Sequence, residues 1–325
     1  MSLWGALALS APACAPSAPP KMVGASDAPV EAPDRAPEPE QHPPSAPVPD
    51  DVVERAALPF HALRAANRVS LDQHEFFDEL ATNDVVCVAE HHDNPHHHWA
   101  QLFVIQELAR RSKSSGRELG VGFEMFEARF QDTLTHYASG KLDTEALLQS
   151  TDYEARWGYP FQYYEPQIVH AVDQGSALVA LNASREQVKT VAHGGFSALS
   201  DRELRLLGAY DLEDAEHRAQ FDKLMQGHPQ SGSVDQMYAA QVLWDESMAQ
   251  NAASWLSERF PARQLVILAG MAHCHRSAIP SRLQRRFAAK VVSVQPLVLS
   301  DDDESADLTS QLAGYDYGFV MTPNP

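Results

Sequence analysis

The sequence lacks an excess of basic residues, and it lacks long apolar runs. Its 25 Lys and Arg residues are outnumbered by 44 Asp and Glu residues, which gives a net charge of −19 over 325 residues. A nucleic-acid partner requires a basic face for its phosphates, so this charge balance argues against one. No stretch reaches the roughly 18 consecutive apolar residues that predict a membrane-spanning helix. Small ligands, metals, cofactors and proteins remain as candidate partners.

The common local signatures of catalysis are missing as well. The chain contains no HExxH zinc motif, no GxSxG nucleophile turn, no phosphate-binding P-loop and no GxGxxG dinucleotide motif. No reaction type can therefore be assigned from a single motif. The candidate functional residues have to be identified from their position in the predicted fold.

The first 57 residues are predicted to lie outside the folded domain. Residues 3–14, LWGALALSAPAC, form a short apolar run ending in Cys14 that resembles a bacterial lipoprotein signal, whose cysteine is lipidated after cleavage. The run lacks a basic start, so residues 1–14 are predicted to be a truncated signal. Ala11 also stands where such signals usually carry leucine. The alternative is that Cys14 is an ordinary thiol in a disordered tail.

Residues 15–57 are rich in Pro, Ala, Ser and acidic residues. Such a segment buries too little apolar surface to fold and is predicted to be a disordered, extended tether. Together with a lipid on Cys14, it predicts a protein of the bacterial envelope, anchored to the outer membrane or periplasmic, that meets the membrane only through its lipid. A disulfide between Cys87 and Cys274 is possible in that compartment, and the sequence leaves it open.

Five short apolar runs predict buried strands at 84–89, 119–124, 176–181, 264–270 and 290–299. Helical patterns at 96–111, 164–175, 233–260 and 277–287 alternate with them. Near-continuous apolar runs suit strands covered on both faces, so the alternation predicts an α/β fold with a mostly parallel sheet flanked by helices. The domain is expected to span residues 58–300, followed by an acidic C-terminal extension at 301–325.

Two segments are too long to be single crossover helices. Residues 126–165 and 183–232 each separate one predicted strand from the next by far more than one helix requires. We interpret both as parts of a smaller, inserted helical subdomain that caps one end of the sheet. Because ligands bind beyond the carboxyl ends of parallel strands, such a cap would close the binding cleft.

Polar residues follow the carboxyl end of each of four predicted strands. Because parallel strands point these ends the same way, the side chains are expected to converge on one cleft. Carboxylates with imidazoles suit a divalent metal or acid–base catalysis, and imidazole also binds haem iron. The alternative is that the polar strand ends coincide by chance. The predicted metal ligands are Glu90, His92, Asp93, Glu124 and His273, and Asn182 ends the remaining strand.

Three consecutive histidines, His96, His97 and His98, lie in the first turn of a predicted helix. Side chains in one turn fan around the helix, so at most two of them can face a common point. His96 is expected to be solvated, with His97 or His98 packing against the preceding loop. His275, two residues after His273, is expected either to join the cleft or to face solvent.

These motifs together resemble the ChaN-like family of haem-binding, iron-regulated bacterial lipoproteins, which shares a superfamily with Tiki-type proteases and erythromycin esterases. AEHHDNPHHH resembles the family's Gly-Glu-x-His-Asp-Asn-Pro strand end, with Ala89 in place of the glycine. GFEMFEARFQ, RWGYPFQYYEPQI, the strand ending at Asn182, WDESMA and LAGMAHCHRSAIPSRL follow in the family's order. The resemblance covers roughly residues 57–300.

The resemblance implies haem binding in iron uptake at the outer membrane, with a possible homodimer around stacked haems. Tyrosine is the residue type expected to hold the iron, with histidine nearby, which makes Tyr163 and Tyr164 the first candidates and Tyr159 and Tyr153 weaker ones. The alternative is that these aromatic residues only pack in the cap. The predicted haem-binding residues are Tyr163, Tyr164, Trp157, His97 and Asn182, with Arg156, Arg185 and Arg276 as candidates for the propionates.

Three functional hypotheses remain open. The first is a haem-binding envelope lipoprotein, with haem or another small molecule as ligand. The second is a hydrolase of the wider superfamily, in which Glu90, His92, Glu124 and His273 bind a metal or activate water. Haem binding alone does not need two buried carboxylates, and this favours a second role for the strand ends. The third is an envelope scaffold that binds a protein partner.

Overall fold

The structure, a computed structural model, describes residues 48–226, 233–299 and 308–322. All of these belong to one unit that extends from residue 36 to residue 325. The predicted signal, the lipidation at Cys14 and most of the tether lie outside the described residues. Among the helices described, none is long and apolar enough to cross a bilayer.

The chain folds around an eight-stranded sheet in the order β2-β1-β8-β7-β3-β6-β4-β5. The strands from β8 to β5 in this order are parallel, and β1 pairs antiparallel with β2 and β8. This confirms the predicted α/β class with a mostly parallel sheet. The strands are β1 (Phe60–Arg64), β2 (Val69–Leu71), β3 (Val85–Glu90), β4 (Glu118–Glu127), β5 (Ala177–Asn182), β6 (Arg263–Gly270), β7 (Val291–Val298) and β8 (Tyr317–Met321).

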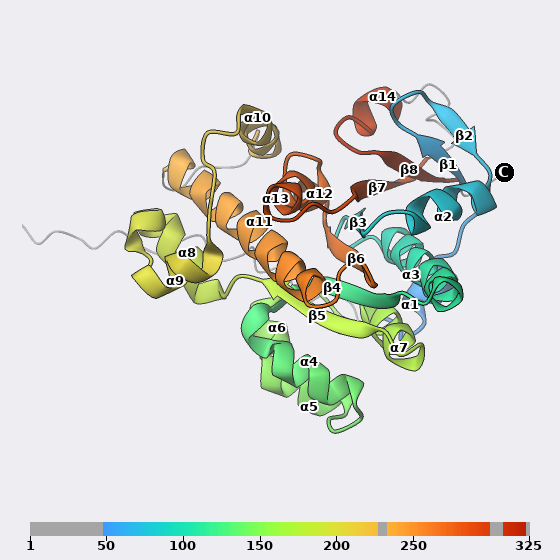
Figure 1. Cartoon of the computed structure of the whole chain (residues 1–325), viewed down its shortest axis with the longest axis horizontal. Helices are drawn as coiled ribbons and strands as arrows, with labels where there is room; N and C mark the ends of the chain where they lie inside the picture. Colours follow the sequence, from blue (N-terminus) through green and yellow to red (C-terminus); the bar gives the residue numbers. More distant parts are fainter. Residues whose placement is uncertain (1–47, 227–232, 300–307, 323–325) are drawn as a thin grey trace, which may run out of the picture. The chain divides into compact units, whose positions relative to one another are not determined.

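Helices cover both faces of the sheet (Figure 1). Alternate residues of β3 point to opposite faces, so Val86 and Val88 join one core while Val85 and Cys87 join the other. The first core is covered by α2 (Gln73–Ala81), α3 (Pro95–Ser115) and α7 (Glu165–Asp173). The second core is covered by α11 (Val234–Ser257), α12 (Met271–Cys274) and α13 (Ile279–Arg286).

The loop after β3 is fixed by local capping. The Asn94 side chain accepts hydrogen bonds from the backbone N–H groups of His96 and His97, and Pro95 occupies the first helical position of α3. At the other end, Gly116 ends the helix in the left-handed conformation with φ 71°. The strand-end residues and the first turn of α3 are therefore held in one rigid connection.

The two predicted cap segments form separate groups. The first comprises η1 (Ala128–Phe130), α4 (Gln131–Ala138), α5 (Thr144–Thr151), α6 (Tyr153–Arg156) and η2 (Phe161–Tyr163), and its buried residues join the core of the α3 face. The second comprises α8 (Arg185–Gly194), η3 (Phe196–Ala198), α9 (Asp201–Leu207) and α10 (Ala215–Leu224), and it has its own core with α11. The predicted inserted helical segments are therefore present, and they pack on two different cores.

Both predicted domain boundaries were too narrow. Strand β8 (Tyr317–Met321) lies between β1 and β7 in the sheet, so this part of the predicted extension belongs to the fold. Helix α1 (Val52–Arg55) contacts α3 and buries Val53, which places part of the predicted tether in the fold. Helix α14 (Leu308–Gln311) precedes β8. A disulfide joins Cys87 of β3 to Cys274 of α12, 187 residues later, and so settles the pairing that the sequence left open.

Candidate functional site

Four adjacent strands bring the predicted polar residues to one edge of the sheet. In the order β3-β6-β4-β5, Glu90 pairs in register with Gly270, and β5 ends in Asn182. Glu124 lies in β4 directly after Phe123, the last residue of that strand to pair with β6. His273 follows in α12, one turn beyond Gly270. The expected convergence at the carboxyl edge is therefore present, and most of these side chains are buried.

The first half of the site is centred on Glu90, which is 1% exposed. Its Oε1 accepts hydrogen bonds from His92 Nδ1 at 2.6 Å and from the Tyr164 hydroxyl at 2.8 Å, while His98 Nδ1 lies 3.4 Å from Oε2. Burial raises the pKa of Glu90, but His98, His92 and Tyr164 outweigh it and hold that pKa at about 2. Burial lowers the pKa of His92, and its contact with Glu90 reverses this to a net increase.

The second half is a chain of buried ionisable groups. Glu124 Oε1 lies 3.2 Å from His273 Nε2, and Asp245 Oδ1 lies 2.7 Å from His273 Nδ1. The other oxygen of Asp245 accepts from His217 Nε2 at 2.8 Å. Arg282, which is fully buried, donates to His217 Nδ1 at 3.0 Å. Five elements, β4, α12, α11, α10 and α13, thus supply one hydrogen-bonded relay.

Each charged group in this relay stabilises the ionised form of its neighbours. Burial lowers the pKa of His273, but Glu124 and Asp245 on its two sides raise it to about 10. Burial raises the pKa of Asp245, and His273 and His217 reverse this to a value well below the ordinary one. The pKa of Glu124 is likewise lowered by His273 against the effect of burial. His273 is therefore a buried imidazolium between two carboxylates at neutral pH.

The two halves meet at Gly270. Its N–H donates to Glu124 Oε2 at 2.7 Å, and a β-carbon at this position would lie 3.1 Å from the ring of His92. Its φ of −55° is open to any residue, so the glycine is required for space rather than for backbone conformation. The His92 ring and the Glu124 carboxylate therefore both lie close to Gly270, at the end of β6.

Asn182 and Asp93 do not act as predicted. Asn182 Nδ2 donates to the backbone oxygen of Glu124 at 2.8 Å and its Oδ1 accepts from Ala183 N–H, so this side chain orders the strand end. Asp93 is exposed and lies outside the buried cluster. Within residues 48–226, 233–299 and 308–322, no three His, Cys, Asp or Glu side chains are arranged to hold a metal ion. The predicted ligands pair with one another instead, and the metal prediction gains no support.

The histidines after Asn94 have structural partners. His96 Nδ1 lies 2.7 Å from the carbonyl oxygen of Ala56, so His96 is tied to the chain before β1 rather than solvated. His97 Nδ1 accepts from the backbone N–H of His91 at 3.0 Å. His98 Nε2 donates to the carbonyl oxygen of His92 at 3.0 Å. His97 thus fixes the loop, as expected, and its free nitrogen carries a proton, which makes it a poor iron ligand.

The candidate tyrosines divide by burial. Tyr164 is 0% exposed and Tyr153 is 4% exposed, so neither can face a large ligand in this structure. Three aromatic residues beside the cluster are only partly buried, and we call them the aromatic rim: Trp157, Tyr159 and Tyr163. The rings of Trp157 and Tyr159 each lie 4.9 Å from the ring of His92, and Tyr163 stacks on His98 at 4.9 Å.

Arginines proposed for haem propionates differ in availability. Arg156 donates to Glu127 at 2.9 Å and to Glu186 at 3.2 Å, which already neutralises it. Arg185 donates through its side chain to the carbonyl oxygen of Ala155. Arg276 is exposed. The guanidinium nearest to the aromatic rim in sequence, that of Arg156, is therefore engaged in ion pairs.

Sequence reasoning missed His217 and Arg282 and gave no role to Asp245. Asp245 and the neighbouring Glu246 are both 0% exposed on α11, a helix that is otherwise apolar where it packs on the sheet. Two adjacent acidic residues in such a helix were the available signal, because buried carboxylates require partners. The identity of those partners depends on how α10 and α13 pack against α11, which no sequence pattern indicates.

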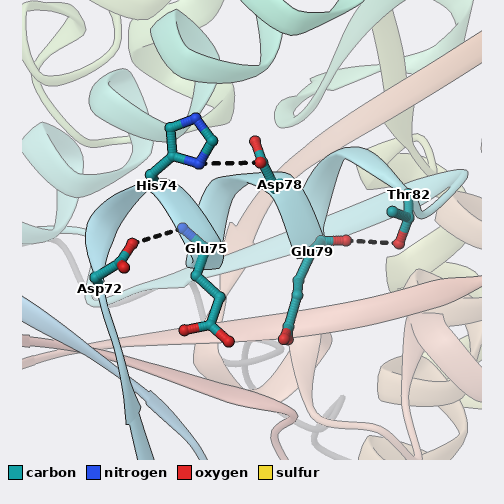
Figure 2. Close-up of a pocket in the computed structure, with 6 residues that line it drawn as sticks. All are labelled: Asp72, His74, Glu75, Asp78, Glu79 and Thr82. Carbon is teal, nitrogen blue, oxygen red and sulfur yellow. Dashed lines mark hydrogen bonds and ion pairs between the residues drawn. The ribbon is translucent and has the colours of Figure 1, made fainter.

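A separate hollow lies on the outer surface of α2 (Figure 2). The Asp72 side chain accepts from Glu75 N–H at the start of the helix, His74 pairs with Asp78, and the Thr82 hydroxyl donates to the Glu79 carbonyl oxygen. Most of the polar groups drawn in Figure 2 thus satisfy local helix contacts, whereas the Glu79 carboxylate accepts from Arg64 and from the Tyr317 hydroxyl. None of them belongs to the strand-end cluster, and the hollow is a feature of one exposed helix.

Comparisons with known proteins identify the family of the chain and a solved structure with a similar fold. A family model described as haem-binding uptake, Tiki superfamily, ChaN matches residues 76–283. The solved structure of cofacial heme binding to ChaN of Campylobacter jejuni has a TM-score of 0.64 at 18% identity and covers 81% of this chain and 96% of that chain. Protein RETICULATA-RELATED 5, chloroplastic, of Arabidopsis thaliana is 24% identical over 214 residues, covering 63% of this chain and 29% of that protein. The chain therefore spans less than a third of this plant relative.

Proposed function

Because the chain belongs to the ChaN family of haem-binding uptake proteins in the Tiki superfamily, we propose that it binds haem at the aromatic rim. The family match over residues 76–283 carries the proposal. The rim supports it, because partly exposed indole and phenol rings provide apolar contact for a porphyrin and a phenol can serve as an axial ligand. The residues that would hold the haem are Trp157, Tyr159 and Tyr163.

Electrostatics favour Tyr159 over Tyr163 as the axial ligand. Burial and the nearby Asp93 raise the pKa of Tyr163, which works against the phenolate. A phenolate on Tyr159 would instead lie beside the imidazole of His92, whose pKa is raised by Glu90. Tyr164 is excluded as a ligand in this arrangement because its hydroxyl donates to Glu90. Bound haem would supply an iron centre for transport or storage, while these side chains bind and orient it.

We assign the protein to iron acquisition in the bacterial envelope as part of the same proposal. The buried disulfide between Cys87 and Cys274 supports this, because such cross-links persist in oxidising compartments. The lipoprotein-like run ending at Cys14 supports a lipid anchor. Metabolic labelling with palmitate tests the anchor: the label should be incorporated and should disappear in Cys14→Ala.

Haem titration tests the central proposal. Haemin added to the purified chain should give a saturable, red-shifted Soret band with about 1 µM affinity or better, a midrange value for a specific ligand. Tyr159→Phe should weaken haemin binding at least about tenfold and remove the ligand-to-metal charge-transfer absorption of the tyrosinate, because the phenol oxygen is lost while the ring remains. Val169→Phe, at an exposed position outside the rim, is the control. A folded wild-type protein with no saturable shift would refute haem binding.

Dimerisation around stacked haems belongs to this proposal and has its own measurement. Light scattering after size exclusion should show a shift from monomer to dimer when haemin is added. A mass that stays monomeric at saturating haemin would remove the dimer and leave the binding site intact.

A specific observation also favours a second function. Two buried carboxylate–imidazole pairs, Glu90 with His92 and Glu124 with His273, face one another across Gly270. In the first pair, His92 Nδ1 faces the carboxylate, which leaves Nε2 to take a proton from water or to give one to a leaving group. In the second pair, the buried imidazolium of His273 holds the Glu124 carboxylate in place. The arrangement is suited to acid–base hydrolysis of an ester or amide.

The hydrolase proposal is tested separately from haem binding. Ester and amide panels should show turnover that falls at least about 100-fold in His92→Gln, a typical loss for a general acid–base residue. Turnover should persist after chelation, because the catalytic groups proposed are all protein side chains. The haem affinity of His92→Gln is measured in parallel. Absence of turnover on every substrate would refute the hydrolase and leave the haem proposal untouched.

A further inference from the structure

A cavity of about 580 Å³ opens beside the strand-end loop, where His91, Asn94 and His97 contribute to its lining. It lies between the first turn of α3, helices α10 and α12, the end of β7 and the segment after α14, elements whose places are shown in Figure 1. Its volume falls in the range of small-molecule sites. None of its lining residues belongs to the aromatic rim, so the cavity is distinct from the proposed haem site.

Part of the cavity lining is apolar. Helix α10 contributes Phe221 and Leu224, and β7 contributes Pro296 and Leu297. Leu224 is 52% exposed, so it offers a large apolar surface to a ligand in the cavity. Sites for small organic ligands combine such apolar walls with a few polar groups, and this wall suits a compact hydrocarbon body.

The cavity lining carries a positive side chain, although the protein as a whole is strongly acidic. The chain carries 44 Asp and Glu residues and a net charge of −19, yet none of the described residues that line the cavity is a carboxylate. Among the described lining residues, Lys223 is the one lysine, and no arginine is present. A cationic ligand would find no carboxylate among the described lining residues, whereas an anion would meet the ammonium group of Lys223.

Two histidines in the lining present N–H groups. His97 Nδ1 accepts from the backbone N–H of His91 at 3.0 Å, and His275 Nδ1 accepts from the backbone N–H of Ser277 at 3.2 Å. A neutral imidazole that accepts at Nδ1 carries its proton at Nε2, so both rings are donors at that atom. Burial lowers the pKa of His97 to about 3 and that of His275 to about 4, so both rings are neutral at pH 7.

We propose that this cavity binds a small carboxylate that carries an apolar body. The hydrocarbon part lies against Phe221, Leu224 and Leu297, and the carboxylate accepts hydrogen bonds from imidazole N–H groups and from the ammonium of Lys223. The first turn of α3, which contributes His97, adds the positive end of a helix of 21 residues. The site is independent of haem, and it adds a second ligand to the protein.

The test uses three probes with one aromatic body and different charges: 2-naphthoate, 2-naphthamide and 2-naphthylmethylammonium. Isothermal titration of the purified chain should show saturable binding of the carboxylate. We expect the amide to bind at least about threefold more weakly and the ammonium at least about tenfold more weakly, because only the anion meets a counter-charge. Equal affinity for carboxylate and ammonium, or no saturable binding of any probe, would overturn the proposal.

Matched variants locate the binding. Ala313→Trp places an indole at an exposed position of the lining and should abolish binding of 2-naphthoate. Ala66→Trp makes the same change at an exposed position outside the lining and should leave affinity unchanged. Lys223→Gln should weaken naphthoate about two- to fivefold and leave naphthamide unchanged, as expected for an exposed charge. Naphthoate binding that survives Ala313→Trp in a folded protein would place the probe elsewhere and refute the cavity.

Discussion

The substitution Asp245→Asn tests whether the buried relay is held together by charge. Asp245 is fully buried and accepts from His273 at 2.7 Å and from His217 at 2.8 Å. Asparagine keeps the shape but offers one oxygen and turns an N–H group toward one of the two histidines. Breaking a buried ion pair from one side costs about 3–5 kcal/mol of unfolding free energy, so we expect a loss of that size near pH 6.

The pH dependence makes this prediction specific. The folded pKa of His273 is about 10, above the ordinary 6.5, so the native state binds the extra proton and its stabilisation is complete below about pH 6.5. As pH rises from 6.5 to 10 this contribution is lost, with a slope of up to about 1.4 kcal/mol per pH unit. Asp245→Asn removes one of the two carboxylates that cause the shift. The stability difference between wild type and variant should therefore be largest near pH 6 and become smaller toward pH 10.

Urea denaturation followed by tryptophan fluorescence, repeated at pH 6, 8 and 10, measures this difference. Asp143→Asn is the matched control, because Asp143 is an exposed helix cap and asparagine caps equally well. The control should change stability by less than about 0.5 kcal/mol at each pH. A loss below about 1 kcal/mol for Asp245→Asn at pH 6, or a difference that stays constant to pH 10, would refute a charged relay.

Three further substitutions probe the scaffold of the site. Cys87→Ala breaks a disulfide between residues 187 positions apart and should lower the free energy of unfolding by up to about 5 kcal/mol, because the unfolded chain gains loop entropy. Denaturation with and without reductant measures this loss. A wild-type stability that does not change with reductant would contradict it. Gly270→Ala should displace the His92 ring, since the added carbon would lie 3.1 Å from it, and an unchanged His92 imidazole NMR signal would exclude the contact. Tyr164→Phe removes a hydrogen bond to an ionised Glu90 and should cost about 1.5–3 kcal/mol by thermal denaturation, and a neutral effect would argue against that bond.

The strand-end residues could be predicted because their position follows from chain direction alone. Buried apolar runs predict parallel strands, and the residue that follows each run must lie at the carboxyl edge, which is where Glu90 and Glu124 are found. Tyr163 and Tyr164 show the limit of this reasoning. The two residues are adjacent in one motif, yet Tyr164 is fully buried while Tyr163 is partly exposed. Only the rotation of the short helices before α7 separates them.

The helical partners of the cluster could not be predicted for a related reason. His217 on α10 and Asp245 on α11 meet because those helices form their own apolar core, at an angle and distance that no sequence period encodes. Strand β8 was missed because an acidic segment precedes it and the strand is only 5 residues long. Its place in the sheet depends on pairing with β1 and β7, which are distant in sequence.

The sequence by itself determined the α/β class, the positions of the central strands and the presence of acidic and imidazole side chains at their carboxyl ends. These follow from hydrophobic periodicity and chain direction, which are local properties. Tertiary structure alone decided that His273 lies between two carboxylates, that Cys87 meets Cys274, and that a cavity with no carboxylate among its described lining residues opens beside the cluster. Each of these depends on the packing of helices from distant parts of the chain. The electrostatic character of the site is therefore a product of that packing.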